Sequence, residues 1–233
     1  MDYSYLSANW TAVRDRVAQA CRDAGREPSE VAILPVSKTF GAEVVRAAAA
    51  LGLHRFGENR VQEVREKAPL LADCAIEWVI IGPLQTNKAK DVARLVHEVQ
   101  TLDRIELAEA LDHRLQIEGR AIDVLVQVKT SPEESKHGLA PADLSALLSG
   151  LRRFDTLRVR GLMTIATHTD DTAEVRRCFR QLRELRDAMA AEGHALPRLS
   201  MGMSGDFALA IAEGATELRI GSAIFGGRPA SVN

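Results

Sequence analysis

The chain has 233 residues, of which 46% are hydrophobic, so it can bury a full core as one large domain or two small ones. Its 30 basic and 32 acidic residues give a formal net charge of −2 without a long run of either sign, which argues against a nucleic-acid partner. Three widely spaced cysteines, at positions 21, 74 and 178, argue against a disulfide framework or a zinc knuckle.

The cellular compartment is predicted from the lack of a signal peptide and of a membrane span in the sequence. The N-terminus carries no apolar stretch of signal-peptide length, and no run of 18 apolar residues suggests a membrane span. We therefore expect a cytoplasmic protein without a membrane partner. No metal site is expected either, because the six histidines show no H-x-x-x-H or H-x-H spacing.

Short apolar runs alternate along the chain with longer stretches of helical periodicity. The runs predict eight strands, at residues 31–36, 54–57, 76–82, 97–102, 121–128, 157–165, 198–202 and 216–221. Helical patterns lie at residues 41–52, 60–71, 86–96, 104–116, 141–153, 172–193 and 205–214, and another helix, roughly 7–25, precedes the first strand.

A strand followed each time by a helix implies parallel pairing, and eight such repeats close into a barrel. No Pro/Gly/Ser-rich linker interrupts the series. We therefore predict a single domain over residues 1–233, an α/β protein with a (β/α)8 TIM barrel and an extra N-terminal helix. An open doubly wound sheet is disfavoured because no G-x-G-x-x-G follows the first strand.

Lys38 follows the first predicted strand by two residues and precedes a glycine that opens a helix. Ligands of such barrels sit at the C-terminal ends of the strands, so the amine should point into the mouth of the barrel. A partly desolvated amine loses some preference for its charged form and can form a Schiff base with a carbonyl. The alternative is an ordinary solvated lysine in a loop.

Two loops near the C-terminus have the composition of a phosphate site. Ser204 is predicted as the N-cap of the helix at 206–213, which would leave free amides beside its hydroxyl. After the eighth strand, Gly221 permits close backbone approach and Ser222 adds a second hydroxyl. Barrels of this kind recurrently bind phosphate with the loops after strands seven and eight, although glycine and serine are also ordinary turn residues.

Arg219 lies within the eighth predicted strand, two positions before Gly221 and therefore on the same face. An inward-facing arginine needs a partner because an unpaired buried charge is costly. That partner is either a structural carboxylate or a ligand atom. Together with a reactive lysine and a phosphate site, the arginine favours a phosphorylated aldehyde, and pyridoxal 5'-phosphate (PLP) fits best.

The sequence closely resembles the pyridoxal phosphate homeostasis protein family, also called the proline synthase co-transcribed family, whose barrel is similar to the N-terminal domain of alanine racemases. The resemblance covers nearly the whole chain. Its motifs are "VSKTF" (36–40), "FGENRVQE" (56–63), "IGPLQTNK" (81–88), "EESKHG" (133–138), "RGLMTI" (160–165), "LSMGMS" (199–204) and "RIGSAIFG" (219–226).

The resemblance implies that Lys38 carries PLP as an internal aldimine and that Ser204, Gly221 and Ser222 hold its phosphate. It also implies that Arg219 faces the pyridine nitrogen, keeping it unprotonated and weakening the ring as an electron sink.

The resemblance further suggests that Asn59 reaches the cofactor or its lysine, and that Met163 packs on the ring face. A helix cap and an ordinary core residue are their structural alternatives. For Lys136 two interpretations stay open, namely a position at the mouth of the barrel or a salt bridge with Glu133 or Glu134.

Three functions follow from these patterns. The preferred one is a PLP carrier that affects vitamin B6 and amino-acid homeostasis, because alanine racemases need an additional β domain and a second acid/base that this chain does not supply. A PLP-dependent racemase-like enzyme with Lys38 as one base is the alternative. A Schiff-base aldolase acting on a sugar phosphate is the third. PLP-requiring apo-enzymes are possible recipients of the cofactor, and the resemblance implies a monomer.

Overall fold

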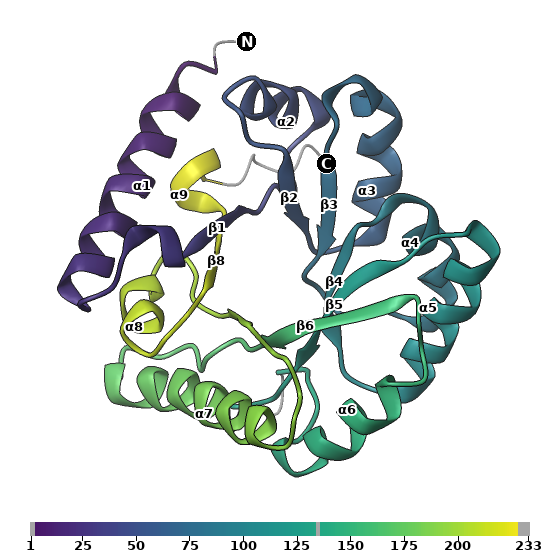
Figure 1. Cartoon of the computed structure of the whole chain (residues 1–233). Helices are drawn as coiled ribbons and strands as arrows, with labels where there is room; N and C mark the ends of the chain where they lie inside the picture. Colours follow the sequence, from purple (N-terminus) through teal and green to yellow (C-terminus); the bar gives the residue numbers. More distant parts are fainter. Residues whose placement is uncertain (1–2, 134–135, 228–233) are drawn as a thin grey trace.

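The computed structural model describes residues 3–133 and 136–227, and eight parallel strands surround its centre (Figure 1). The strands are β1 (Ala32–Pro35), β2 (Arg55–Glu58), β3 (Glu77–Ile80), β4 (Glu98–Leu102), β5 (Ile122–Gln127), β6 (Leu157–Met163), β7 (Arg198–Ser200) and β8 (Glu217–Ile220). All eight predicted strands are confirmed. Several end earlier than predicted, since residues 81–82, 164–165 and 201–202 belong to the loops above the barrel.

The strands follow one another around the sheet in the order β1-β8-β7-β6-β5-β4-β3-β2. A bridge between Val36 and Gly57 joins the two ends of that order, and the Ser37 amide donates to the Gly57 carbonyl over 3.0 Å. The sheet is therefore a nearly closed barrel, as the alternation of strands and helices predicted. All eight C-terminal strand ends consequently lie on one face of the molecule.

Helices form the outer ring of the barrel (Figure 1). They are α1 (Tyr5–Asp23), α2 (Ala42–Ala49), α3 (Val61–Lys67), α4 (Ala89–Leu95), α5 (Ile105–Glu118), α6 (Leu144–Leu151), α7 (Thr172–Ala191), α8 (Phe207–Ala212) and α9 (Ser222–Phe225). Short 3-10 segments lie at Pro28–Glu30, Ala68–Cys74, Thr86–Lys88 and Pro141–Asp143.

The extra N-terminal helix α1 runs alongside α8 and α9 (Figure 1). Its buried side chains repeat with helical spacing, at Leu6, Val13, Val17 and Cys21. The Asn9 amide also donates to the Ile224 carbonyl over 3.0 Å. The helix thus covers the part of the barrel wall next to β8 and supports the chain segment that follows it.

The apolar core lies between the strands and the ring of helices. The strands β4 and β8 are buried along their whole length, as expected for parallel strands covered on both faces. Part of the interior of the barrel is polar, because Glu98, Gln100, Ser200, Glu217 and Arg219 are all buried within the strands. One of these residues, Arg219, also lines the cavity at the C-terminal ends of the strands, which is described below.

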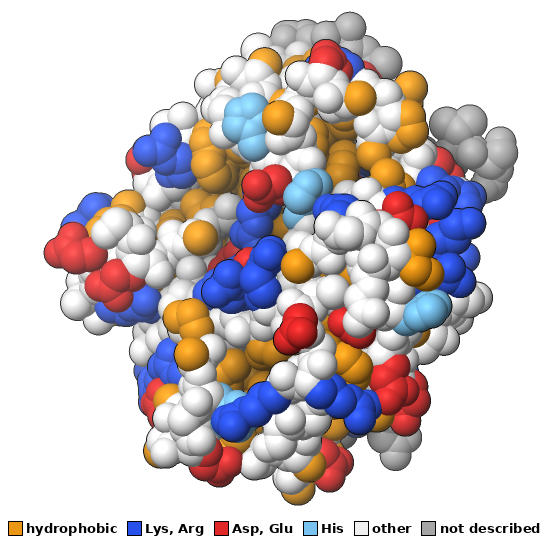
Figure 2. All heavy atoms as spheres, turned by 45° about the vertical axis from the view of Figure 1, so that its right-hand side comes forward, with side chains coloured by type: hydrophobic (Ala, Val, Ile, Leu, Met, Phe, Trp, Pro, Cys, Tyr) orange, Lys and Arg blue, Asp and Glu red, His pale blue; other side chains and the backbone are white. Residues whose placement is uncertain are grey.

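The helices differ in length, and the face shown in Figure 2 carries charged side chains of both signs. None of the helices in residues 3–133 and 136–227 has the length and apolarity needed to cross a bilayer. Acidic and basic side chains are interspersed over the face that Figure 2 shows.

Candidate functional site

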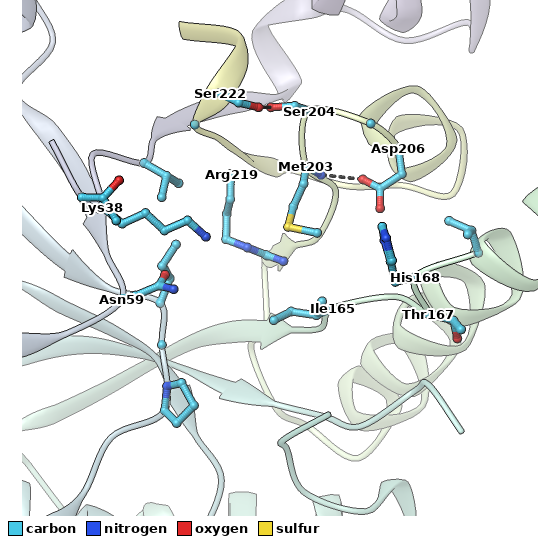
Figure 3. A pocket seen from close by; sticks show the side chains of 18 of the residues that line it. Lys38, Asn59, Ile165, Thr167, His168, Met203, Ser204, Asp206, Arg219 and Ser222 are labelled. Carbon is cyan, nitrogen blue, oxygen red and sulfur yellow. Dashed lines mark hydrogen bonds between the residues drawn. The ribbon is translucent and has the colours of Figure 1, made fainter. Parts of the chain in front are cut away.

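A cavity of about 560 Å³ opens at the C-terminal ends of the strands (Figure 3). Its walls come from the loops that follow β1, β2, β3, β6, β7 and β8. Its lining includes six of the seven predicted cofactor residues, which are Lys38, Asn59, Ser204, Arg219, Gly221 and Ser222. The barrel therefore brings together side chains that lie up to 184 positions apart in the sequence, from 38 to 222.

Lys38 extends from the loop after β1 into this cavity, on the same side as Asn59 (Figure 3). It is half-buried, whereas the preceding residue, Ser37, is completely buried. Thr39, the next residue, has a φ of 70°, which is uncommon for a β-branched residue. The backbone around Lys38 is therefore held in an unusual conformation, and specific contacts must maintain it.

Ser204 and Ser222 meet at one end of the cavity, with their hydroxyl oxygens 3.4 Å apart (Figure 3). Ser222 begins α9, whose Ile224 and Phe225 amides donate to the Gly221 carbonyl, whereas the amide of a first helical residue has no carbonyl partner within the helix. Gly221 precedes it with little room for a side chain, since a Cβ there would lie 3.2 Å from the Val36 carbonyl oxygen. Hydroxyls and backbone amides in such a place form a receptor for an anion.

The predicted N-cap role of Ser204 is wrong. The helix α8 begins at Phe207, three residues further on, and Asp206 occupies the preceding position. The Asp206 carboxylate accepts a hydrogen bond from the Met203 amide over 2.6 Å and closes the turn in which Ser204 lies. This turn leaves the Ser204 hydroxyl directed toward Ser222 instead of toward the amides of α8.

Arg219 lies at the floor of the cavity and is 4% exposed. Its guanidinium donates to the Ser200 hydroxyl over 2.8 Å and to the Thr164 carbonyl over 2.7 Å. Within the described residues no carboxylate lies within ion-pair distance of it, so the structural carboxylate expected as one possible partner does not contact it. Burial lowers the pKa of Arg219 to about 10, and the side chain remains a cation at neutral pH.

Asn59 reaches the cavity because β2 and β3 end very close together. Gly82, after β3, approaches the backbone of Asn59 so closely that a Cβ there would collide with the Asn59 carbonyl oxygen. Ile81 and Gly82 line the cavity beside Asn59. The glycine in "IGPLQTNK" is thus required for the shape of this wall.

Met163 is completely buried and does not belong to the lining of this cavity. It is the last residue of β6, in register with Gln127 and Ser200 of the neighbouring strands. Met163 is thus a core residue next to the cavity, and its packing on a cofactor ring stays a prediction. Ile165, two residues closer to the mouth, and Met203 line the cavity in its place.

Lys136 forms the salt bridge that was one of its two predicted roles. Its ammonium lies 3.5 Å from the Glu133 carboxylate, and it is not part of the cavity lining. Glu133 in turn accepts a hydrogen bond from the amide of His168, a residue at the rim of the cavity. Glu134, the other predicted partner, lies outside the described residues.

Sequence patterns did not reveal the contacts that support the lining. Beneath Arg219, the Ser200 hydroxyl is hydrogen-bonded to Gln100, and the Gln100 amide donates to Glu98 and Glu217. These two carboxylates form ion pairs with Arg55 and Arg198. Behind Lys38, a buried lysine, Lys67, contacts Glu58 and Glu63. The spacing of Glu63 and Lys67 in "QEVREK" places them on one helix face, which is the signal that could have pointed to this pair.

Metal ligation gains no support from side-chain positions. Among the residues that the structure describes, no group of three or more His, Cys, Asp or Glu side chains could hold a metal ion. The chemistry of the cavity is instead that of a primary amine, a buried guanidinium and a pair of hydroxyls. Such a set can bind an anionic molecule and react with a carbonyl group.

Comparisons with known proteins place the chain among close relatives. The family "Alanine racemase, N-terminal domain" matches residues 3–229. A pyridoxal phosphate homeostasis protein of Pseudomonas aeruginosa is 42% identical over 97% of this chain and 96% of its own length. One from Aquifex aeolicus is 43% identical over 93% of this chain and 95% of its own length. PipY of Synechococcus elongatus, solved with PLP bound, is 37% identical with a TM-score of 0.80, covering 90% of this chain and 100% of its own.

Proposed function

The chain belongs to the pyridoxal phosphate homeostasis protein family, and we propose that it binds PLP through Lys38 and serves in intracellular vitamin B6 and amino-acid homeostasis. The observation that carries the proposal is the meeting of Lys38, Arg219 and the two serine hydroxyls in one cavity. The proposed unit is a single PLP-binding domain over residues 1–233.

The cavity fits the chemistry of this cofactor. PLP supplies an aldehyde that condenses reversibly with a primary amine. The lysine amine lies on one side of the cavity and the serine pair at another, with Arg219 between them and deeper in the barrel (Figure 3). The cavity therefore offers an amine for the aldehyde of PLP, two hydroxyls for its phosphate and a guanidinium for its ring nitrogen.

Each side chain has a defined task in the proposal. Lys38 provides the amine, and Ser204, Gly221 and Ser222 hold the phosphate with their hydroxyls and amides. Arg219 faces the pyridine nitrogen and Asn59 contacts the cofactor from the β2 side. A guanidinium can only donate hydrogen bonds, so a ring nitrogen that accepts from Arg219 stays unprotonated.

An unprotonated nitrogen favours a carrier over an enzyme, because a neutral ring is a weak sink for the electrons of a carbanion. We therefore propose reversible uptake and delivery of PLP, with PLP-requiring apo-enzymes as recipients and a monomer as the working form. The proposed location is the cytoplasm. The free state of Cys21, Cys74 and Cys178 supports a reducing compartment.

The test begins with a visible absorbance spectrum of the purified protein incubated with PLP. We expect a visible band that borohydride bleaches, followed by a phosphopyridoxyl mass on the peptide that contains Lys38. Lys38→Ala should abolish both signals, and Lys90→Ala, which removes an exposed lysine outside the cavity, should retain both.

Two outcomes would contradict the proposal. A protein that stays colourless and unmodified with PLP, but is trapped by borohydride on a phosphorylated ketose, would indicate an aldolase instead. Exchange of an amino acid's α-proton with solvent deuterium, lost in Lys38→Ala, would indicate a racemase-like enzyme rather than a carrier.

A further inference from the structure

The two residues that flank Lys38 are hydrogen-bonded to the same group of charges, of which two members are buried and one is half-buried. This group, called here the Lys67 cluster, consists of Glu58, Glu63 and Lys67. It lies where β2 and α3 meet the loop after β1, and none of its three members lines the cavity. The cluster therefore contacts the segment that presents Lys38 without contacting a molecule in the cavity.

Lys67 is the centre of the cluster and is 6% exposed. Its ammonium lies 2.7 Å from Glu58 Oε1 and 3.3 Å from Glu63 Oε2. Its third contact is the carbonyl oxygen of Ser37, 3.0 Å away. These three acceptors match the three donors of an ammonium group, which is the condition for burying it without a large penalty.

Both flanking residues also bond directly to the two carboxylates. The Ser37 hydroxyl donates to Glu58 Oε1 over 2.6 Å. On the other side of Lys38, the Thr39 amide donates to Glu63 Oε2 over 2.7 Å. Three of the five bonds in the cluster thus end on Ser37 or Thr39.

The backbone conformation of Thr39 depends on these bonds. A β-branched residue with φ of 70° is strained and persists only where its surroundings enforce that conformation. The bond from its amide to Glu63, with Glu63 held by Lys67, provides part of that enforcement. A turn hydrogen bond of 3.1 Å from the Phe40 amide to the Ser37 carbonyl provides the rest. Loss of the Glu63 bond should therefore weaken the restraint on this backbone and on the direction of the Lys38 side chain.

We propose that Lys67 is a positioning residue for Lys38. Through Glu63 and Glu58 it fixes the backbone on both sides of Lys38, so that the amine is directed into the cavity before any ligand arrives. This role rests on the proposed function, since it assumes that Lys38 is the group that captures PLP. Preorganisation of this kind reduces the entropic cost of binding and raises affinity.

The experiment compares Lys67→Met with the wild-type chain and with Lys90→Met, which removes an exposed lysine on α4. Because Lys67→Met leaves the buried Glu58 carboxylate unpaired, the double variant Glu58→Gln/Lys67→Met is measured in parallel. The first measurement is hydrogen exchange of the Thr39 amide without PLP, and the second is the dissociation constant for PLP.

We expect exchange at Thr39 to accelerate about tenfold or more in both Lys67 variants, while the Val36 amide, bonded to Ile220 within the barrel, keeps its protection. The dissociation constant for PLP should rise about tenfold, equivalent to about 1.4 kcal/mol. Adding Thr39→Gly to Lys67→Met should recover part of the affinity, because glycine adopts positive φ without strain.

Unchanged Thr39 exchange and PLP affinity in a folded Lys67 variant would overturn the positioning role and leave the proposed function intact. Wild-type protein that takes up no PLP on Lys38 would overturn the proposed function and the positioning role with it. A loss of protection at Val36 equal to that at Thr39 would also overturn the proposal, because it would show that Lys67 only stabilises the fold.

Discussion

Glu58 shows how strongly one buried side chain depends on its neighbours. It is completely buried, its Oε1 receives bonds from Ser37 and Lys67, and its Oε2 has no hydrogen-bond partner. Burial raises the pKa of Glu58 from 4.5 to about 7, although Lys67 and Ser37 act against that rise. The group therefore changes its protonation near neutral pH, unlike an exposed glutamate.

The direction of the resulting pH dependence follows from this raised pKa. Below pH 4.5 both the folded and unfolded states hold the proton, and the full contribution of Glu58 to stability is present. As pH rises toward 7 the unfolded state loses its proton first, so the free energy of unfolding falls.

Glu58→Gln should remove this dependence. Between pH 4.5 and 7 the wild-type free energy of unfolding should fall on the order of 2 kcal/mol relative to the variant, as measured by urea titration at several pH values. Glu66→Gln, an exposed change on α3, serves as the control and should follow the wild-type profile. Parallel pH profiles for wild type and Glu58→Gln would refute this assignment of the pKa.

At the scale of the elements, the site depends on where strands end and how closely their ends approach. The loop from Met203 to Asp206 and the start of α9 bring the serine pair together, and Gly82 lets β3 end against the backbone of Asn59. Positions just beyond the strands thus form much of the cavity wall, the place where this fold usually binds ligands.

Gly82→Ala tests the close approach of β2 and β3. Its Cβ would collide with the Asn59 carbonyl oxygen, so either Asn59 or the end of β3 must move. We expect a loss of about 1–3 kcal/mol in the free energy of unfolding, together with weaker PLP binding. Gly227→Ala is the matched control, because nothing lies within 4 Å of the Cβ built there. Equal stability of the two variants would show that the wall adapts freely.

At the scale of the whole molecule, a polar network connects the two ends of the barrel interior. Near the N-terminal ends of the strands, Arg198 lies 2.7 Å from Glu217 and 2.6 Å from Glu98, and Arg55 also pairs with both carboxylates. Above them, Ser200 links Gln100 to Arg219 with bonds of 2.7 and 2.8 Å. The floor of the cavity is therefore anchored through groups that do not line the cavity themselves.

Glu217→Gln should be destabilising because it leaves the half-buried Arg55 and Arg198 with Glu98 as their one remaining carboxylate partner among the described residues. Burial alone would raise the pKa of Glu217, but Arg55 and Arg198 overcome this and lower it. Its contribution to stability is thus present above the unfolded-state pKa of 4.5 and disappears as pH falls through the lower folded-state value.

We expect Glu217→Gln to lose about 2–3 kcal/mol at pH 7, with a weaker dependence on acid than the wild type, as measured by chemical unfolding. Glu118→Gln breaks a more exposed pair with Arg94 and should cost less than about 1 kcal/mol. Similar losses of unfolding free energy in the two variants would mean that the interior ion pairs stabilise the fold no more than a surface ion pair does.

The sequence by itself determined the barrel, its eight strands and six of the residues that line the cavity. Strand and helix periodicities are local properties, and a regular alternation of the two leaves few topologies. Lys38, Arg219 and the serine loops were identifiable because this fold places the ends of its strands on one face. Family motifs added Asn59, which also lines the cavity, and Met163, which does not.

Only the tertiary structure decided which side chains support that lining. Met163 and Ile165 lie two residues apart on the same chain segment, and the position where β6 ends determines which of them reaches the cavity. Likewise, Ser37 and Glu58 are 21 positions apart, and Ser200 and Gln100 are 100 apart, yet each pair is hydrogen-bonded. Such contacts arise from strand register and packing between distant segments, which periodicity within one segment does not encode.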